Sequence, residues 1–291
     1  MTAFQALDVG FGLIFIFLLL SLICTAVNEI IASIFGFRAQ MLKQGIGRLL
    51  DNPALIDTFY KNSLIKSLSR EGKDPSYISA RTFRMALTSL AKVRDLTKVS
   101  SIRDAIVAWP VSPDLQNSLL ALIDDAGGNI EKIKLNIEKW FDDTMERVTG
   151  WYVRRMKWIS LIVACVITIG SNADTISITK AFIRNPALRE AVAAQAQAYT
   201  ERSQADSDAA PSTIITNTTE QIKQMQIPLG WPMNSELVPD GWLNKIIGLL
   251  LTTIAISLGA PFWFDLLQRV AKIRGSGAQP QTAEEERIKD E

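Results

Sequence analysis

A run of 19 residues without a charged side chain lies near the start of the chain, from Val9 to Val27. A helix of that length rises about 28 Å, close to the hydrocarbon thickness of a bilayer, about 30 Å. The residues before the run include no Lys or Arg, so it lacks the basic segment that opens a cleaved signal peptide. Apolar residues resume after Glu29. The sequence therefore predicts a retained transmembrane helix over residues 9–37, preceded by a short external N-terminus over residues 1–8.

Two later apolar blocks predict two further crossings. The block from Trp158 to Ser171 is too short alone, at about 21 Å, so the helix is expected to continue to residue 178. The third block runs from Gly241 to Phe264 and contains Pro261 near its end, where proline should kink or close the helix. The predicted fold is all-α, an integral membrane protein with three transmembrane helices, at residues 9–37, 158–178 and 241–264.

The positions of Lys and Arg predict the orientation of these helices. Basic residues follow the first block, precede the second and follow the third, whereas the segment between the second and third blocks is acidic overall. Lys and Arg close to a membrane helix favour the cytoplasmic side. We therefore expect the N-terminus outside the cell and the C-terminus in the cytoplasm. The basic residues concerned are Arg38, Lys43, Arg48, Arg154, Arg155, Lys157, Arg269, Lys272 and Arg274.

The segments between the crossings have distinct characters. Residues 38–157 contain several helix-start signals, such as Asn52-Pro53, and predict a cytoplasmic helical domain whose last helix continues into the second crossing. Residues 179–240 are expected outside, as a helix that begins at Asn185-Pro186 followed by a flexible polar loop over residues 203–221. Residues 265–291 are expected to form a cytoplasmic tail that is disordered from about residue 275.

Several classes of active site are excluded by composition. The chain contains no histidine, which removes the usual general base near neutral pH and the commonest metal ligand. Its two cysteines, Cys24 and Cys165, lie inside apolar blocks and are interpreted as packing residues. No Walker loop, CxxC, GxSxG or dinucleotide fingerprint occurs. We expect no enzymatic activity, cofactor or metal, and the net charge of +1 argues against a nucleic-acid partner.

Small and polar residues recur at helical spacing in all three apolar blocks. In the third block the stripe consists of Gly248, Thr252, Ala255 and Gly259. Such stripes let helix backbones approach closely and form hydrogen bonds between helices. They predict packing among the three helices of one chain. The alternative is that one stripe faces another protomer or lines a pore.

Charged residues near the predicted membrane boundaries are the other candidates. Asp174 and Lys245 are expected at the outer boundary, where they would pair directly or through Asn172. Glu29 and Asp265 are expected at the inner boundary as interfacial anchors, since no charge lies at the midplane, where a transporter would place one. Gly259 with Pro261 predicts a break in the third helix, interpreted as a packing kink with a gate as the alternative. The candidate site residues are Glu29, Asn172, Asp174, Lys245, Gly259, Pro261 and Asp265.

Four stretches are typical of family motifs: GLIFIFLLLSLICTAVNE, PSYISARTF, NADT and SLGAPFWFDLL. In these stretches the chain resembles a family of uncharacterised bacterial inner-membrane proteins. The resemblance covers most of the chain except residues 203–220 and the tail. It implies a bacterial inner membrane and draws attention to Asn172, Asp174, Pro261 and Asp265, but it implies no activity and no catalytic residue.

Two hypotheses of function follow. The first is a non-enzymatic membrane platform or scaffold, whose cytoplasmic helical domain docks a protein partner or self-associates. The alternative is a homo-oligomeric pore or channel with the small-residue stripes around its axis. Both make the lipid bilayer a partner, and the first adds a cytoplasmic protein or a second copy of the chain.

Overall fold

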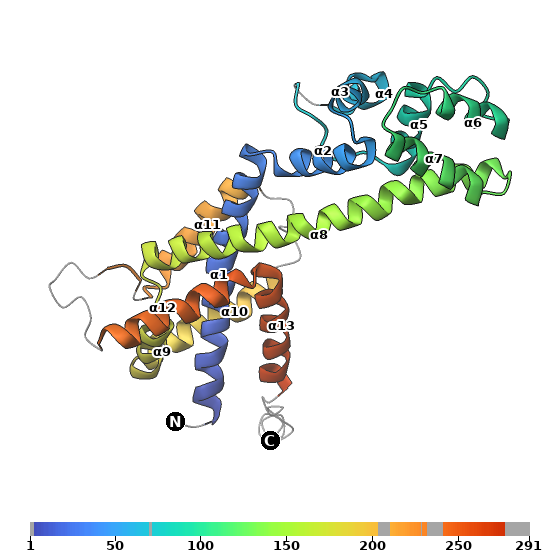
Figure 1. The fold of residues 1–291 in the computed structure, drawn as a ribbon. Helices are drawn as coiled ribbons and strands as arrows, with labels where there is room; N and C mark the ends of the chain where they lie inside the picture. Colours follow the sequence, from blue (N-terminus) through green and yellow to red (C-terminus); the bar gives the residue numbers. More distant parts are fainter. Residues whose placement is uncertain (1–2, 70–71, 203–209, 228, 232–240, 277–291) are drawn as a thin grey trace, which may run out of the picture. The chain divides into compact units, whose positions relative to one another are not determined.

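The computed structural model is built from α-helices (Figure 1). It describes residues 3–69, 72–202, 210–227, 229–231 and 241–276. No strand occurs among these residues, so the all-α prediction is confirmed. The chain divides into two compact units, and each is described by itself. The first unit comprises Met1–Ile31 and Lys157–Glu291, and the second comprises Ala32–Met156.

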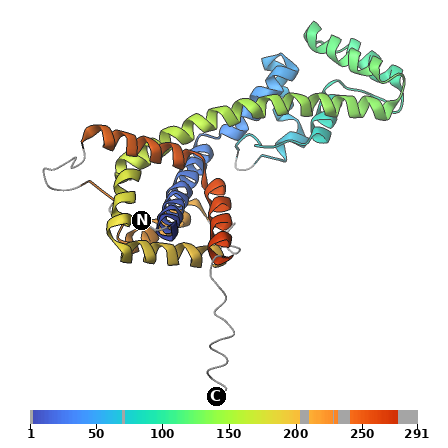
Figure 2. The same cartoon turned by 90° about the horizontal axis from the view of Figure 1, so that it is seen from below.

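The first unit is organised around α1 (Ala3–Ile34), which contains the uncharged run. Viewed along its axis, α1 lies in the middle of the other helices of the unit (Figure 2). Phe11, Phe15, Ile16 and Leu19 of α1 are completely buried. Its apolar side chains are therefore covered largely by protein. The helices of this unit besides α1 are the end of α8 (Ile130–Ser171), α9 (Thr175–Arg184), α10 (Pro186–Arg202), α11 (Pro211–Gln224), α12 (Trp242–Ser257) and α13 (Ala260–Ser276).

One helix of the described residues, over Gln5–Ile34, is long and apolar enough to cross a membrane. Two bent pairs pass the same test only when each pair is counted as one span, which gives up to three spans. The axes of α8 and α9 differ by 48°, and those of α12 and α13 differ by 95°. The helix expected over residues 158–178 is therefore interrupted after Ser171, whereas the break expected at Gly259 and Pro261 in the third block is present. The first predicted span is also shifted, because α1 begins inside the predicted N-terminal segment and ends before Gly36.

Both breaks have a local cause in the backbone. Asn172 has φ +49°, a left-handed conformation that asparagine tolerates better than most residues, and α8 ends just before it. Gly259 has φ +87°, which glycine adopts without a Cβ clash, and it separates α12 from α13. Pro261 then occupies the first turn of α13, where its missing N–H leaves no hydrogen bond unmade.

After the break at Gly259, α13 packs along α1 toward the start of α1. The rings of Trp263 and Phe17 are 4.8 Å apart, and Arg274 lies 3.2 Å from Asp8. Residues 265–276, which the sequence assigned to a tail, are therefore part of a helix that packs on α1 and brings Arg274 beside Asp8. The bend at Gly259 turns the chain back, and α13 buries Leu267 against the core of the unit. The disorder expected toward the C-terminus concerns residues outside those described.

The polar stretch after α10 is partly helical. Pro211 opens α11, which continues to Gln224, so the loop expected over residues 203–221 is wrong from Pro211 onward. Proline in the first turn favours a helix start, and residues of α11 such as Ile222 pack on the apolar core of the unit. Residues 203–209 lie outside the described part of the chain. The helix expected at Asn185-Pro186 is present as α10.

The second unit is a small helical domain with its own core. Its elements begin where capping residues predict: the Asn52 side chain accepts hydrogen bonds from Ala54 N and Leu55 N, and Ser112 Oγ accepts one from Leu115 N. The helix expected to continue into the second apolar block is present as α8. The core includes Phe59, Phe83 and Phe141. The helices besides α8 are α2 (Phe37–Leu50), α3 (Pro53–Lys61), α4 (Ser63–Lys66), α5 (Ala80–Leu90), α6 (Val99–Val107) and α7 (Pro113–Asp125).

Candidate functional site

The structure brings Asn172, Asp174 and Lys245 together where the break between α8 and α9 meets α12. Lys245 Nζ lies 3.4 Å from Asp174 Oδ2, and the two side chains are 12% and 4% exposed. The pairing expected between these residues is therefore present. Because both groups are almost fully covered by protein, neither charge has much water to solvate it, and the pair neutralises them together.

Asp174 is held by the start of α9 as well as by Lys245. Its Oδ1 accepts hydrogen bonds from Ile176 N at 2.9 Å and Ser177 N at 3.3 Å, and its Oδ2 accepts one from Ser177 Oγ at 2.8 Å. Asp174 is thus the N-cap of α9, whose first free N–H groups donate to its side chain. The positive end of the α9 dipole adds to the stabilisation of the carboxylate.

The small-residue stripe of α12 provides the room for this carboxylate. Gly248 lies directly against Asp174, and any Cβ at Gly248 would overlap the carboxylate oxygen Oδ1. One turn later, Thr252 Oγ1 accepts a hydrogen bond from Thr175 N at 3.1 Å and donates one to Gly248 O at 2.9 Å. It also lies 2.7 Å from Thr175 Oγ1. The stripe of α12 therefore packs on α9 within the same chain.

A third segment closes the site over the end of α8. Asn172 Nδ2 donates to Gly230 O at 2.8 Å, and Gly230 N donates to Ser171 O at 2.7 Å. Trp231 Nε1 donates to Ile169 O at 2.8 Å, and its ring centroid is 5.6 Å from Lys245 Nζ. These bonds satisfy carbonyls that the end of a helix leaves open. We call the whole cluster the polar junction, made of Asn172, Asp174, Thr175, Gly230, Trp231, Lys245, Gly248 and Thr252.

The groups of the polar junction hold α8, α9 and α12 together through an ion pair and hydrogen bonds. Its carboxylate and its ammonium form an ion pair, and its hydroxyls belong to Thr175 and Thr252. The neighbouring Ser177 hydroxyl donates to the same carboxylate. Among the described residues, no group of three His, Cys, Asp or Glu side chains is placed to hold a metal ion. Asn172 Oδ1 and the nearby Thr168 Oγ1 are buried without a hydrogen-bond partner among the described residues.

The other predicted site residues lie elsewhere. Gly259 and Pro261 form the bend between α12 and α13, which Trp263 Nε1 bridges by donating to Ala255 O at 2.6 Å. Glu29 on α1 and Asp265 on α13 are exposed. The structure therefore separates the predicted residues into the polar junction, the bend and two surface carboxylates.

Sequence reasoning missed which helices of the first unit expose apolar surface. On α8 the exposed side chains are Trp158, Ile162, Val166 and Ile169. On α12 they include Leu243, Ile247, Leu250 and Ile254, and Leu258 follows at its C-terminal cap. Both sets recur every three or four residues, which places each on one face of its helix. The spacing was present in the sequence, opposite the small-residue stripes, and would have identified these faces.

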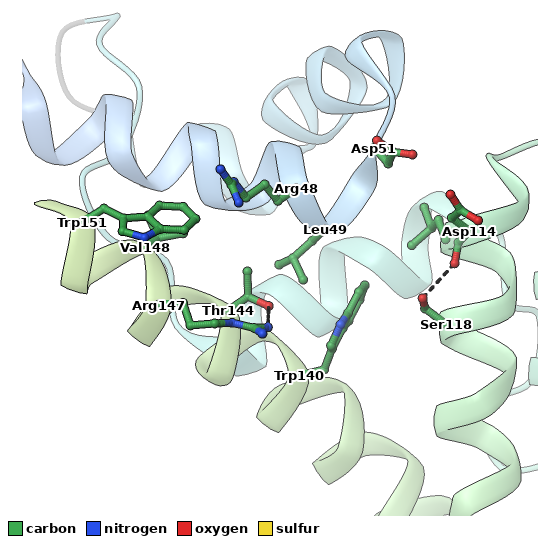
Figure 3. A pocket seen from close by; sticks show the side chains of 11 residues that line it. Arg48, Leu49, Asp51, Asp114, Ser118, Trp140, Thr144, Arg147, Val148 and Trp151 are labelled. Atoms are coloured by element: carbon green, nitrogen blue, oxygen red, sulfur yellow. Dashed lines mark hydrogen bonds between the residues drawn. The ribbon is translucent and has the colours of Figure 1, made fainter.

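The second unit contains a pocket of about 550 Å³ between α2, α7 and α8 (Figure 3). Its volume falls in the range of small-molecule sites. The guanidinium of Arg48 lies 4.0 Å from the ring centroid of Trp151, and Arg147 Nη2 lies 3.5 Å from Thr144 Oγ1. Asp51 and Asp114 lie toward the end of the pocket away from Trp151 (Figure 3). Nothing in the sequence indicated this pocket, since its lining comes from three separate helices.

Comparisons of this chain with family models, with curated proteins and with solved structures found no match. The candidate sites therefore have to be interpreted from their own geometry.

Proposed function

We propose that the chain is a membrane-embedded platform. In this proposal the first unit lies in the bilayer, and the second unit lies in the cytoplasm, where it docks a protein partner or self-associates. The observation that carries the proposal is the pair of exposed apolar faces on α8 and α12. Isoleucine, leucine and valine in long exposed stripes are typical of surfaces that contact lipid or another protein.

The interior of the first unit supports the same proposal. Hydrocarbon offers no water, so polar backbone groups at helix breaks need partners within the protein. The break after Ser171 meets that need through Gly230 and Trp231, and the charges of Asp174 and Lys245 are paired.

The proposed orientation rests on the basic residues next to α1 and α8. Arg38, Lys43 and Arg48 follow α1, and Arg154 and Arg155 precede the apolar half of α8. The positive-inside rule then places the second unit in the cytoplasm and the start of α1 outside. The end of α13 belongs on the same side as Asp8, its ion-pair partner. The resemblance to bacterial inner-membrane proteins supports that membrane as the location.

The pore alternative has less support. A pore needs small or polar residues around an open axis, whereas α1 occupies the middle of the first unit (Figure 2). Thr252 of the α12 stripe is buried inside one chain, and so are the small residues Ala164 and Thr168 of the second apolar block. They are therefore engaged in packing within the chain and are not free to line a channel between chains.

Alkaline carbonate extraction of membranes and cysteine labelling test this proposal. The full chain is expected to remain in the membrane pellet. In a background with Cys24→Ala and Cys165→Ala, Ser100→Cys should react with an impermeant thiol reagent only after permeabilisation. Ser212→Cys should react in intact cells. Extraction of the wild type by carbonate would overturn the membrane assignment, and ion conductance in liposomes would favour the pore.

A further inference from the structure

Two neighbouring segments of the second unit carry basic residues without any acidic ones. Helix α2, over Phe37–Leu50, contains Arg38, Lys43 and Arg48 and no Asp or Glu. The stretch of α8 from residue 147 to residue 156 contains Arg147, Arg154 and Arg155 and again no Asp or Glu. Helix α5 also contains arginines and no acidic residue, but its Arg84 is paired with Glu138 at 2.7 Å. The surface over α2 and this part of α8 therefore has a positive charge contributed by two helices.

Aromatic rings connect these two segments. The guanidinium of Arg155 lies 4.9 Å from the ring centroid of Phe37, and that of Arg48 lies 4.0 Å from the ring of Trp151. Phe35 stacks on Phe37 with centroids 5.5 Å apart and planes at 11°. Arginine stacks on aromatic rings and its guanidinium also matches the geometry of phosphate oxygens.

The same surface exposes large apolar side chains. Ile34 is 73% exposed and Phe35 is 58% exposed, at the start of the second unit. Arg38, Arg154 and Arg155 are exposed too, and none of them has an acidic partner among the described residues. Exposed aromatic and apolar residues beside unpaired cations are the composition of a membrane interface, where rings insert between headgroups and cations contact phosphates.

We infer that this basic-aromatic surface, made of Ile34, Phe35, Phe37, Arg38, Arg48, Trp151, Arg154 and Arg155, binds the headgroups of anionic phospholipids. Guanidinium groups bind phosphate oxygens through paired hydrogen bonds, which zwitterionic headgroups satisfy less well because their ammonium groups repel the arginines. Ile34 and Phe35 select a lipid over a soluble anion, since a soluble phosphate would leave them in water. This inference rests on the proposed function, because it requires the second unit to face a bilayer.

The test compares lipid binding to the full chain in detergent, by native mass spectrometry. Phosphatidylglycerol and phosphatidylcholine are added at equal concentration to three proteins: the wild type, the variant Arg38→Gln/Arg154→Gln/Arg155→Gln, and the control Lys61→Gln/Lys66→Gln/Arg81→Gln. The control removes the same charge from exposed positions elsewhere in the same unit. Each basic residue near an anionic surface contributes about 1 kcal/mol, or about fivefold in affinity.

The wild type and the control should prefer phosphatidylglycerol, and the surface variant should lose at least about tenfold of that preference. The preference should also weaken as salt rises from low to high concentration. Equal preference in the surface variant and the control would overturn the inference, and so would complete displacement of the lipid by glycerol phosphate. The two proposals fail separately: extraction by carbonate contradicts the membrane assignment, whereas a chain that resists carbonate but binds both lipids equally contradicts only the headgroup site.

Discussion

The ammonium of Lys245 on α12 lies 3.4 Å from the carboxylate of Asp174 at the start of α9, at a position where protein covers both side chains. A buried ion pair of this kind contributes through the cost of breaking it, because either charge alone would be left unsolvated. Since the pair also joins the break after α8 to α12, its loss should loosen the contact between these segments.

Lys245→Gln should lower the free energy of unfolding by about 3–5 kcal/mol, because Asp174 would remain buried and charged without its cation. Asp174→Asn should also destabilise, and it additionally weakens the cap of α9. The double variant should lose less than the sum of the two single losses. Thermal unfolding of the four proteins in detergent measures the coupling. Strict additivity would show that the two residues do not interact.

A methyl group at Gly248 should disturb the polar junction. Gly248→Ala places a Cβ on the Asp174 carboxylate, so the helices have to separate or the carboxylate has to rotate away from its partners. A loss of about 1–3 kcal/mol is expected. Gly170→Ala is the matched control, because that helical glycine has open space around it and alanine favours helix by about 1 kcal/mol. Equal thermal unfolding of the two variants would contradict the close approach at Gly248.

The stability of variants at Gly259 should depend on the backbone conformation at that residue and not on the space available for a side chain. A Cβ at Gly259 would meet only Pro261 Cδ, at 3.8 Å, but the φ of +87° is unfavourable for any residue with a Cβ. Gly259→Ala should therefore cost about 1–2 kcal/mol, and Gly259→Leu should cost nearly the same. Stability measured by thermal unfolding tests this. A much larger loss for leucine than for alanine would indicate that packing, as the small-residue stripe suggested, is the limiting factor.

The hydroxyl of Tyr60 in the second unit should contribute to alkaline unfolding. Burial raises the pKa of the Tyr60 phenol, and the Asp74 carboxylate raises it further. The part of the free energy of unfolding that depends on a neutral phenol is therefore complete below the unfolded pKa of about 10. It is lost as pH rises from there toward the folded pKa.

Replacing Tyr60 by phenylalanine separates the effect of burying the hydroxyl from the effect of its ionisation at alkaline pH. The Tyr60 hydroxyl is buried without a hydrogen-bond partner among the described residues. Tyr60→Phe should therefore be neutral or stabilising near pH 7, by up to about 1 kcal/mol, and should lose less stability between pH 9 and 11. Tyr77→Phe, at a residue 75% exposed, is the control. An unchanged alkaline profile in Tyr60→Phe would contradict the assignment.

The sequence by itself determined the helical composition and several element boundaries. Asn52 and Ser112 cap helices in the structure where their spacing predicts, because a cap depends on residues three positions apart at most. The pair of Asp174 and Lys245 was also predictable, since a charge between two apolar blocks needs a partner of opposite sign. Such features depend on local chemistry, or on one strong electrostatic constraint.

Only the tertiary structure decided how the apolar blocks are used. The uncharged run of α1 is enclosed by its own unit, whereas α8 and α12, which are less uniformly apolar, expose their apolar faces. Hydropathy measures how strongly a segment avoids water and does not distinguish contact with lipid from contact with protein. The left-handed φ of Gly259 turned the third block by almost a right angle and brought Arg274 to Asp8. That reversal depends on the packing of α13 against α1, which no segment of the sequence contains alone.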